Sequence, residues 1–193
     1  MNSRSFFDGE QIRFTALDPE KDADTLSRWS AQPGFVKNNL ESLFRLYSVA
    51  EVKKKFKEAI KDSEKRSRDY YFAVRENKDN SLIGLLHFGW MLPTHQAAMI
   101  FLDFNDSGSL ELYGKETLQK ALDYAFLELS LHRLSVILSS DQSDEIALYE
   151  SAGFLREVQR REGVYFDGRY FDELVYAILR PEWFSQLKEV KND

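Results

Sequence analysis

The segment 114–154 constrains the fold most strongly, because elements of different periodicity follow one another within it. Its first part carries apolar residues at steps of three and four, the spacing of one helix face: Leu118, Ala121, Leu122, Ala125, Phe126 and Leu129. The run 133–138 then changes to residues that favour a strand. The segment from Ser143 to Ala152 predicts a second helix. A strand between two helices indicates a sheet that is covered by helices.

The N-terminal half begins with a predicted strand, 11–17, which two predicted helices follow. Asp18 is expected to cap the first of these helices, and the helix is expected to end near Trp29. Ser48 and Glu51 have the spacing of a capping box at the start of the second. Both helices are therefore predicted from their first residues as well as from their apolar spacing.

Further strands are predicted from β-rich runs that turn residues separate: 70–76, 82–90, 97–104, 154–161 and 170–179. The first three should form an antiparallel meander. Asp167 and Gly168 favour a hairpin turn between the last two. The predicted order is β-α-α-β-β-β-α-β-α-β-β, and because no linker divides the chain, we expect one domain over 1–193.

Composition narrows the classes of function. Of the 193 residues, 43% are hydrophobic and 14% aromatic, which predicts a packed core. The sequence has no cysteine, so disulfides and thiolate chemistry are excluded. A net charge of −6 disfavours binding to nucleic acid and favours a neutral or cationic partner. Because no signal-peptide core or membrane-spanning run is found, we expect a cytoplasmic protein without a membrane contact.

Three stretches together resemble the GNAT superfamily of acetyltransferases: GKETLQKALDYAFLELSLHRLSVIL, IALYESAGF and GVYFDGRYFDELVYAILRPEW. The resemblance is greatest to its RimJ/RimL branch of ribosomal-protein alanine acetyltransferases. It implies an α/β (α+β) GNAT fold, with a mixed central sheet of about seven strands, about four flanking helices, and a splayed wedge between strands four and five. It also implies acetyl-CoA as the co-substrate.

The same resemblance suggests where acetyl-CoA would bind. Its pantetheine arm would add to the strand edge at Leu102 to Phe104 as if it were another strand. The family's glycine-rich pyrophosphate loop corresponds to 109–114, where the sequence keeps only its last glycine. The residues expected to meet the cofactor in this region, and on the helix that we expect to begin at Gly114, are Leu110, Leu112, Gly114 and Lys115. Gln142, in place of a family asparagine, is expected to bond the pantetheine or the acceptor.

By the same resemblance, Tyr149 falls on the family tyrosine that protonates the leaving thiolate. A phenol can supply this proton because it is protonated at neutral pH. The alternative is a tyrosine that only packs. Relatives often place a carboxylate base near 98–99, where this chain has Ala98 and Met99. Asp103 and His87 are the remaining candidates, although Asp103 could cap a loop and His87 could be a half-buried structural histidine.

A metal site is not expected, because the three histidines lie on different predicted elements without ligand spacing. The resemblance implies direct acetyl transfer to a primary amine in a ternary complex, the amine being a peptide N-terminus or a small amine. Trp29 to Asn39, Tyr165 to Phe171 and His87 are expected to line the acceptor site, and two copies could pair as a homodimer. The alternative function is a catalytically impaired acyl-CoA sensor or protein-interaction module, which the altered loop and the missing carboxylate would explain.

Overall fold

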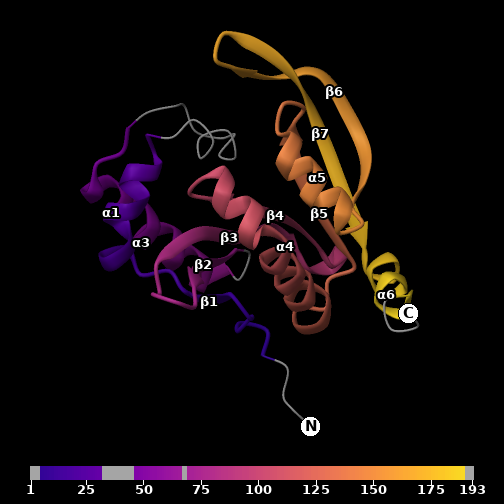
Figure 1. Cartoon of the computed structure of the whole chain (residues 1–193), viewed down its shortest axis with the longest axis horizontal. Helices are drawn as coiled ribbons and strands as arrows, with labels where there is room; N and C mark the ends of the chain where they lie inside the picture. Colours follow the sequence, from indigo (N-terminus) through magenta and orange to yellow (C-terminus); the bar gives the residue numbers. More distant parts are fainter. Residues whose placement is uncertain (1–4, 32–45, 67–68, 190–193) are drawn as a thin grey trace.

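The computed structural model describes residues 5–31, 46–66 and 69–189, and within them a mixed sheet forms the centre of the molecule (Figure 1). Its strands are β1 Ile12–Ala16, β2 Tyr70–Glu76, β3 Leu82–Leu92, β4 Ala97–Phe104, β5 Arg133–Ser139, β6 Leu155–Phe166 and β7 Arg169–Leu179. They lie in the order β1-β2-β3-β4-β5-β7-β6. Only β4 and β5 pair in parallel; the other neighbours pair antiparallel. The predicted GNAT fold is confirmed.

The described helices are α1 Pro19–Trp29, α3 Val49–Arg66, α4 Ser107–Asp123, α5 Ser143–Ser151 and α6 Arg180–Glu189. A π-helical turn at 124–128 continues α4, and a 3-10 turn at 93–95 joins β3 to β4. These are five α-helices where about four were expected, because α6 was not predicted. Within the described residues, none of the helices is both long and apolar enough to cross a membrane.

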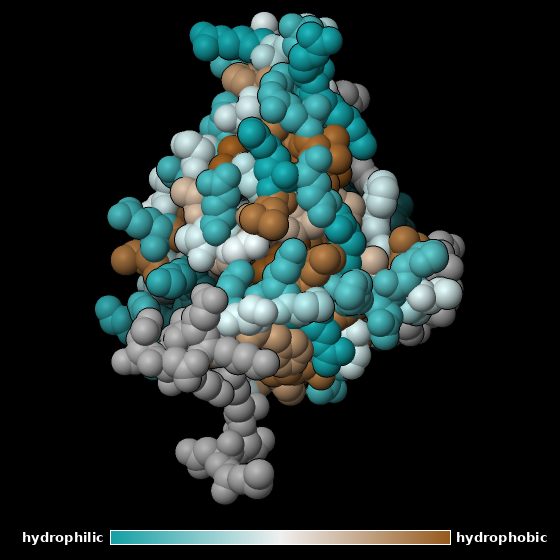
Figure 2. All heavy atoms as spheres, turned by 90° about the vertical axis from the view of Figure 1, so that its right-hand side faces the viewer, coloured by the Kyte–Doolittle hydropathy of each residue, from teal (hydrophilic) through white to brown (hydrophobic). Residues whose placement is uncertain are grey.

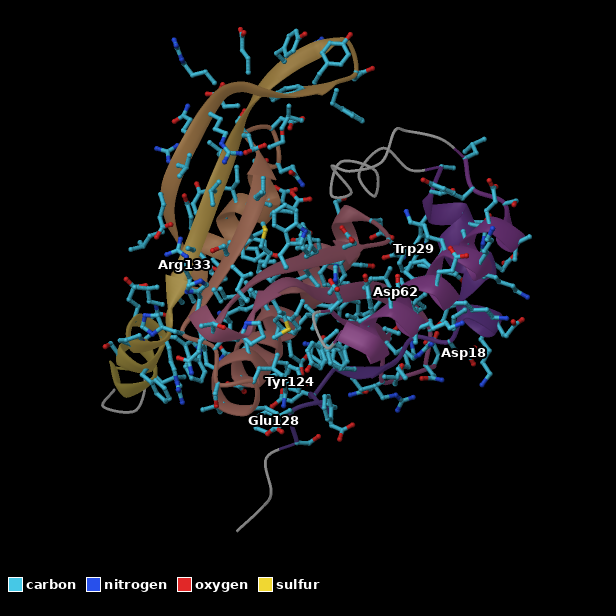
Figure 3. The ribbon with its side chains drawn as sticks, turned by 180° about the vertical axis from the view of Figure 1, so that it is seen from behind. Asp18, Trp29, Asp62, Tyr124, Glu128 and Arg133 are labelled. Carbon is cyan, nitrogen blue, oxygen red and sulfur yellow. The ribbon has the colours of Figure 1, made fainter. Side chains whose placement is uncertain are left out.

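The starts of α1 and α3 follow local capping chemistry. The Asp18 side chain accepts a hydrogen bond from the backbone N–H of Glu20 at 3.0 Å. Glu51 Oε2 accepts from the backbone N–H of Ser48 at 2.9 Å, which completes the predicted capping box. Figure 3 marks the two ends of α1 with Asp18 and Trp29. Both helix starts are confirmed.

The sheet separates two apolar layers, because successive strand residues point to opposite faces. On one face, Phe88 and Ile100 belong to the same buried cluster as Leu118 of α4. Tyr124, labelled in Figure 3, closes the end of this layer with its ring 5.3 Å from that of Phe72. On the other face, Leu85 belongs to a smaller cluster beneath α1 and α3. Helices therefore cover both faces of the N-terminal half of the sheet.

The parallel pair β4 and β5 stays together for a short distance only. Ala97 pairs with Arg133 and Met99 with Ser135, and no later residue of β4 pairs with β5. β5 continues along β7 to its last residue. The ends of β4 and β5 therefore diverge, and the predicted wedge between strands four and five is confirmed.

The long hairpin of β6 and β7 extends beyond α5 (Figure 1). Its turn is at Asp167 and Gly168, with φ values of 49° and 75°. Positive φ at both positions is the type I′ geometry that suits a two-residue hairpin, so the predicted turn is confirmed. Leu155 and Val158 of β6 are exposed. Figure 2 faces this hairpin and shows hydrophobic side chains between hydrophilic ones.

Candidate active site

Tyr149 is the most deeply placed of the predicted site residues. It lies on α5 with only 2% of its surface exposed, and its ring meets that of Phe154 edge to face at 5.0 Å. Burial raises the pKa of Tyr149 well above its usual value, and the negative charges of Asp103 and Glu145 raise it further. The phenol therefore keeps its proton at neutral pH. The side chain packs against Phe154, as one interpretation held, and keeps the proton that the other interpretation requires.

Asp103 comes from β4, on the opposite side of the wedge from α5. It is 8% exposed, and its charge acts on the Tyr149 hydroxyl. The structure thus brings together two candidates that lie far apart in the sequence. A buried carboxylate can attract a cation, and a protonated phenol on the other side of the wedge can donate a proton.

His87 lies on β3, where it pairs with Phe101 of β4 while Leu85 pairs with Asp103. His87 and Asp103 are therefore diagonal neighbours on the same face, with Cα atoms about 7–8 Å apart by sheet geometry. The imidazole Nε2 lies 3.0 Å from Oδ1 of Asp69. Sequence reasoning missed Asp69. It comes two residues before Tyr71, which pairs with His87, so the register of β2 against β3 would have revealed it.

Gln142 links the end of β5 to the start of α5. Its side-chain Oε1 accepts a hydrogen bond at 2.8 Å from the backbone N–H of Ser139, the last residue of β5. The residue is 7% exposed and stands at the N-cap position of α5. The amide oxygen therefore joins the end of β5 to the start of the tyrosine-bearing helix. A contact with pantetheine stays a prediction.

The prediction of a pyrophosphate-binding loop at 109–114 is wrong, because these residues are helical. The helix α4 begins at Ser107 and not at Gly114. Asp106 caps the helix by accepting a hydrogen bond from the backbone N–H of Ser109 at 2.7 Å. After the first turn, the backbone N–H groups of α4 donate hydrogen bonds to carbonyls one turn earlier. Leu110 already does so, because its N–H donates to the Asp106 carbonyl.

The four residues predicted to meet the cofactor here lie inside α4: Leu110, Leu112, Gly114 and Lys115. Their amides cannot cradle a phosphate, because helix hydrogen bonds occupy them. Leu112 is 64% exposed and Lys115 is exposed, so a side-chain contact with the cofactor stays a prediction for them. Leu102 and Phe104, in contrast, lie on the part of β4 that no β5 residue pairs with, where a strand-like arm can add.

The absence of a side chain at Gly114 is explained by packing between two helices. A Cβ atom at this position would come within 3.1 Å of Leu148 Cδ2 on α5 and 3.2 Å of Leu110 Cδ1. The missing side chain therefore lets α4 and α5 approach each other, as closely packed helices require.

We expect Gly114→Val to lower the free energy of unfolding by about 1–3 kcal/mol, because the added carbons overpack the contact between α4 and α5. Urea unfolding followed by circular dichroism measures it. Leu112→Val, on the exposed face of the same helix, is the control and should change the stability by less than about 0.5 kcal/mol. Equal stability of Gly114→Val and the wild type would show that the two helices do not need this close approach.

A mixed sheet that splays between its two parallel strands and is covered by helices on both faces is the arrangement of the GNAT acetyltransferase fold. The model for the "Acetyltransferase (GNAT) domain" matches residues 11–155. The probable N-acetyltransferase YjcK of Bacillus subtilis (strain 168) is 32% identical over 139 residues, 70% of this chain and 75% of the relative. The chain therefore belongs to the GNAT acetyltransferase family, and it is an acetyl-CoA-dependent N-acetyltransferase.

Other relatives extend the similarity along the chain. The SPbeta prophage-derived uncharacterized N-acetyltransferase YokL of Bacillus subtilis (strain 168) is 23% identical over 189 residues, 93% of this chain and 96% of the relative. The crystal structure of spermidine N-acetyltransferase from Vibrio cholerae in complex with CoA and spermine has a TM-score of 0.78 at 22% identity. The match covers 91% of this chain and 99% of the spermidine N-acetyltransferase chain. This structural likeness supports the fold.

Proposed function

We propose that the protein acetylates a cationic primary amine, which attacks acetyl-CoA directly within a ternary complex. The observation that carries the proposal is that two buried polar side chains flank the wedge, Asp103 on β4 and Tyr149 on the helix that follows β5. Asp103 and Glu145 are both close enough to act on the Tyr149 phenol. Carboxylates at this place attract an ammonium group, and a phenol that stays protonated can serve as the acid.

The proton balance of this reaction follows from the groups present. The acceptor ammonium first loses one proton to a base, for which Asp103 and His87 are the candidates. The neutral nitrogen then attacks the thioester carbonyl, the C–N bond forms and the C–S bond breaks. Tyr149 donates its proton to sulfur and regains one from the new amide nitrogen. The net products are the acetylated amine, free thiol and one proton released to water.

Two relatives suggest which amines to test. The spermidine N(1)-acetyltransferase of Vibrio cholerae serotype O1 (strain ATCC 39315 / El Tor Inaba N16961) is 26% identical over 113 residues. The putative ribosomal N-acetyltransferase YdaF of Bacillus subtilis (strain 168) is 35% identical over 65 residues, 34% of this chain. Polyamines and peptide N-termini, the latter being the acceptors of the RimJ/RimL branch, are therefore the two acceptor groups within the proposal.

The hairpin tip adds an aromatic surface to the proposed acceptor site. Tyr165 and Tyr170 are each 64% exposed, and their ring centroids lie 4.9 Å apart. Exposed tyrosine faces attract cations, which suits a charged amine. Trp29 is buried at the end of α1, whereas residues 32–39 of the expected lining lie outside the described residues.

The test is calorimetric titration with acetyl-CoA followed by measurement of thiol release. We expect binding, and we expect release only when spermidine or an alanine-starting peptide is added. Binding without release for both amine classes would favour an acyl-CoA sensor and overturn the proposal. Neither binding nor release would favour a protein-interaction module.

Association of copies is also a proposal. One solved relative is described as the "Dodecameric structure of spermidine N-acetyltransferase from Vibrio cholerae in intermediate state", and it has a TM-score of 0.73. Sedimentation equilibrium of the purified chain tests this: a mass equal to one chain at all concentrations would contradict the expected homodimer.

A further inference from the structure

A row of side chains crosses one face of the C-terminal half of the sheet. Directly paired residues of neighbouring strands point to the same side of a sheet, so the register identifies the members of the row. Met99 of β4 pairs with Ser135 of β5. Ala177 of β7 pairs with Ser135 on one side and with Leu155 of β6 on the other. Four neighbouring strands therefore contribute one residue each, and three of the four are apolar.

A second row lies beside the first on the same face. Val175 of β7 pairs with Ile137 of β5 and with Val158 of β6. Ile137 and Val175 lie two residues from Ser135 and Ala177 along their strands, which places both rows on one side of the sheet. The C-terminal sheet face thus consists of Met99, Ser135, Ile137, Leu155, Val158, Val175 and Ala177.

Much of the C-terminal sheet face is open to solvent. Leu155 is 60% exposed and Val158 is 41% exposed, while Met99, Ile137 and Val175 are half-buried. Among the described residues, the two buried apolar clusters include none of the seven. In Figure 3, α1 and α3 lie at the N-terminal strands, on the opposite side of the picture from the hairpin. The face is therefore apolar and accessible without being part of the core.

Two ion pairs mark the ends of the C-terminal sheet face. Arg133 binds Glu157 at one end, and Figure 3 labels Arg133 at the base of the hairpin. Arg160 binds Glu173 at the other end. Because each arginine is paired with a glutamate, these two pairs carry no net charge, whereas the whole chain carries −6. An apolar centre with a polar rim is the arrangement found in protein interfaces.

We propose that the C-terminal sheet face is an interface between two copies of this chain, which pack sheet against sheet about a twofold axis. The inference rests on the association of copies proposed above and assigns its contact surface.

Charge selects a second copy as the occupant. Two copies of a chain with a net charge of −6 repel each other in general, whereas the balanced ion pairs of this face allow a close approach. A twofold axis in the plane of contact, along or across the strands, either keeps or exchanges the two ends of the face. The ion pairs of one copy then lie over those of the other, and the apolar centres meet. The same balance of charge gives little attraction for nucleic acid or an anionic membrane.

Pairing through the edge of β6 fits the chain less well. β6 is an edge strand, but irregularities interrupt its register at 156–158 and 160–164. Arg161 and Glu162, inside the second of these, are exposed. Bulges and charged side chains are features that prevent edge-to-edge pairing. The face of the hairpin is therefore favoured over its edge.

The first test places a charge on the face. Leu155→Asp should raise the dissociation constant of the dimer roughly tenfold or more, because the contact would remove water from the new carboxylate. Leu155 is exposed in the single chain, so the fold should be retained, which circular dichroism checks. Leu112→Asp is the matched control, because it changes a leucine of similar exposure, 64%, on α4. Sedimentation equilibrium measures both variants. If the wild type were a dimer and Leu155→Asp associated equally well, this interface would be wrong and the association of copies would stand.

The second test uses the absence of cysteine from the sequence. Val175→Cys provides a single thiol near the middle of the face, and packed sheets lie about 10 Å apart, within reach of a short bis-maleimide. We expect a covalent dimer on a denaturing gel for Val175→Cys and a single chain for Leu112→Cys. A single chain for Val175→Cys in a dimeric sample would contradict face-to-face packing.

The mass of the wild type separates the remaining outcomes. A mass of one chain at every concentration would overturn both the association of copies and this interface. Acetyl transfer is judged separately, because neither test uses a substrate or measures turnover.

Discussion

Tyr149→Phe should lower turnover by roughly ten- to a thousandfold while leaving acetyl-CoA affinity nearly unchanged, because the substitution removes the acid but keeps the ring. The ring accounts for the packing against Phe154, so the fold should hold. Since the pKa of Tyr149 is raised above its ordinary value of 10.0, the donor proton remains in place as the pH rises to that value. Steady-state kinetics with the accepted amine, together with calorimetry, measures both effects.

Tyr176→Phe is the matched control. Tyr176 is equally buried, but its hydroxyl donates to Glu150 on α5 at 2.8 Å and so has a structural partner. We expect its turnover to stay within a few-fold of the wild type. If Tyr149→Phe had the same turnover rate as Tyr176→Phe, Tyr149 would have no part in the chemistry. Water would then be the proton donor to the sulfur.

Asp22→Ala should lower the free energy of unfolding by about 3–5 kcal/mol, because it leaves the charge of Arg75 buried without its partner. Asp22 is 3% exposed and its two oxygens lie 2.7 and 2.8 Å from Arg75 Nη2. Arg75 Nε also donates to Thr15 Oγ1 at 2.9 Å. The cluster therefore ties α1 to the strands β1 and β2, and its loss should be visible in urea unfolding.

The exposed ion pair of the same helix offers the comparison. Asp24 and Arg28 lie 3.3 Å apart, with side chains more than two-thirds exposed. Asp24→Ala should cost no more than about 1 kcal/mol, since water screens such a pair. A similar small cost for Asp22→Ala would mean that water reaches Arg75 and that the buried pair does not hold α1 in place.

Much of the fold could be predicted from the sequence because the signals are local. The strands β2 and β4 have the predicted bounds, and the Asp167 and Gly168 turn has the geometry that its residues favour. Capping chemistry placed the start of α1. Each of these depends on a few adjacent residues, so no knowledge of distant contacts was needed.

The start of α4 shows where this reasoning fails. The prediction followed the glycine pattern of the family and placed a loop before Gly114, whereas Asp106 already provides the local signal for a cap. Gly114 is present because a side chain would meet Leu148 on another helix. A contact between two helices cannot be read from the residues of one.

The sequence by itself determined the candidates for chemistry, their elements and the position of the wedge in the strand order. Only the tertiary structure showed which groups lie near one another: Asp103 is near enough for its charge to act on Tyr149, and Asp69, which the sequence reasoning missed, lies against His87. The physical reason is that these approaches depend on strand register and on the divergence of β4 from β5. Both are set by packing between segments that are distant in the chain, and that information is not present in any local pattern.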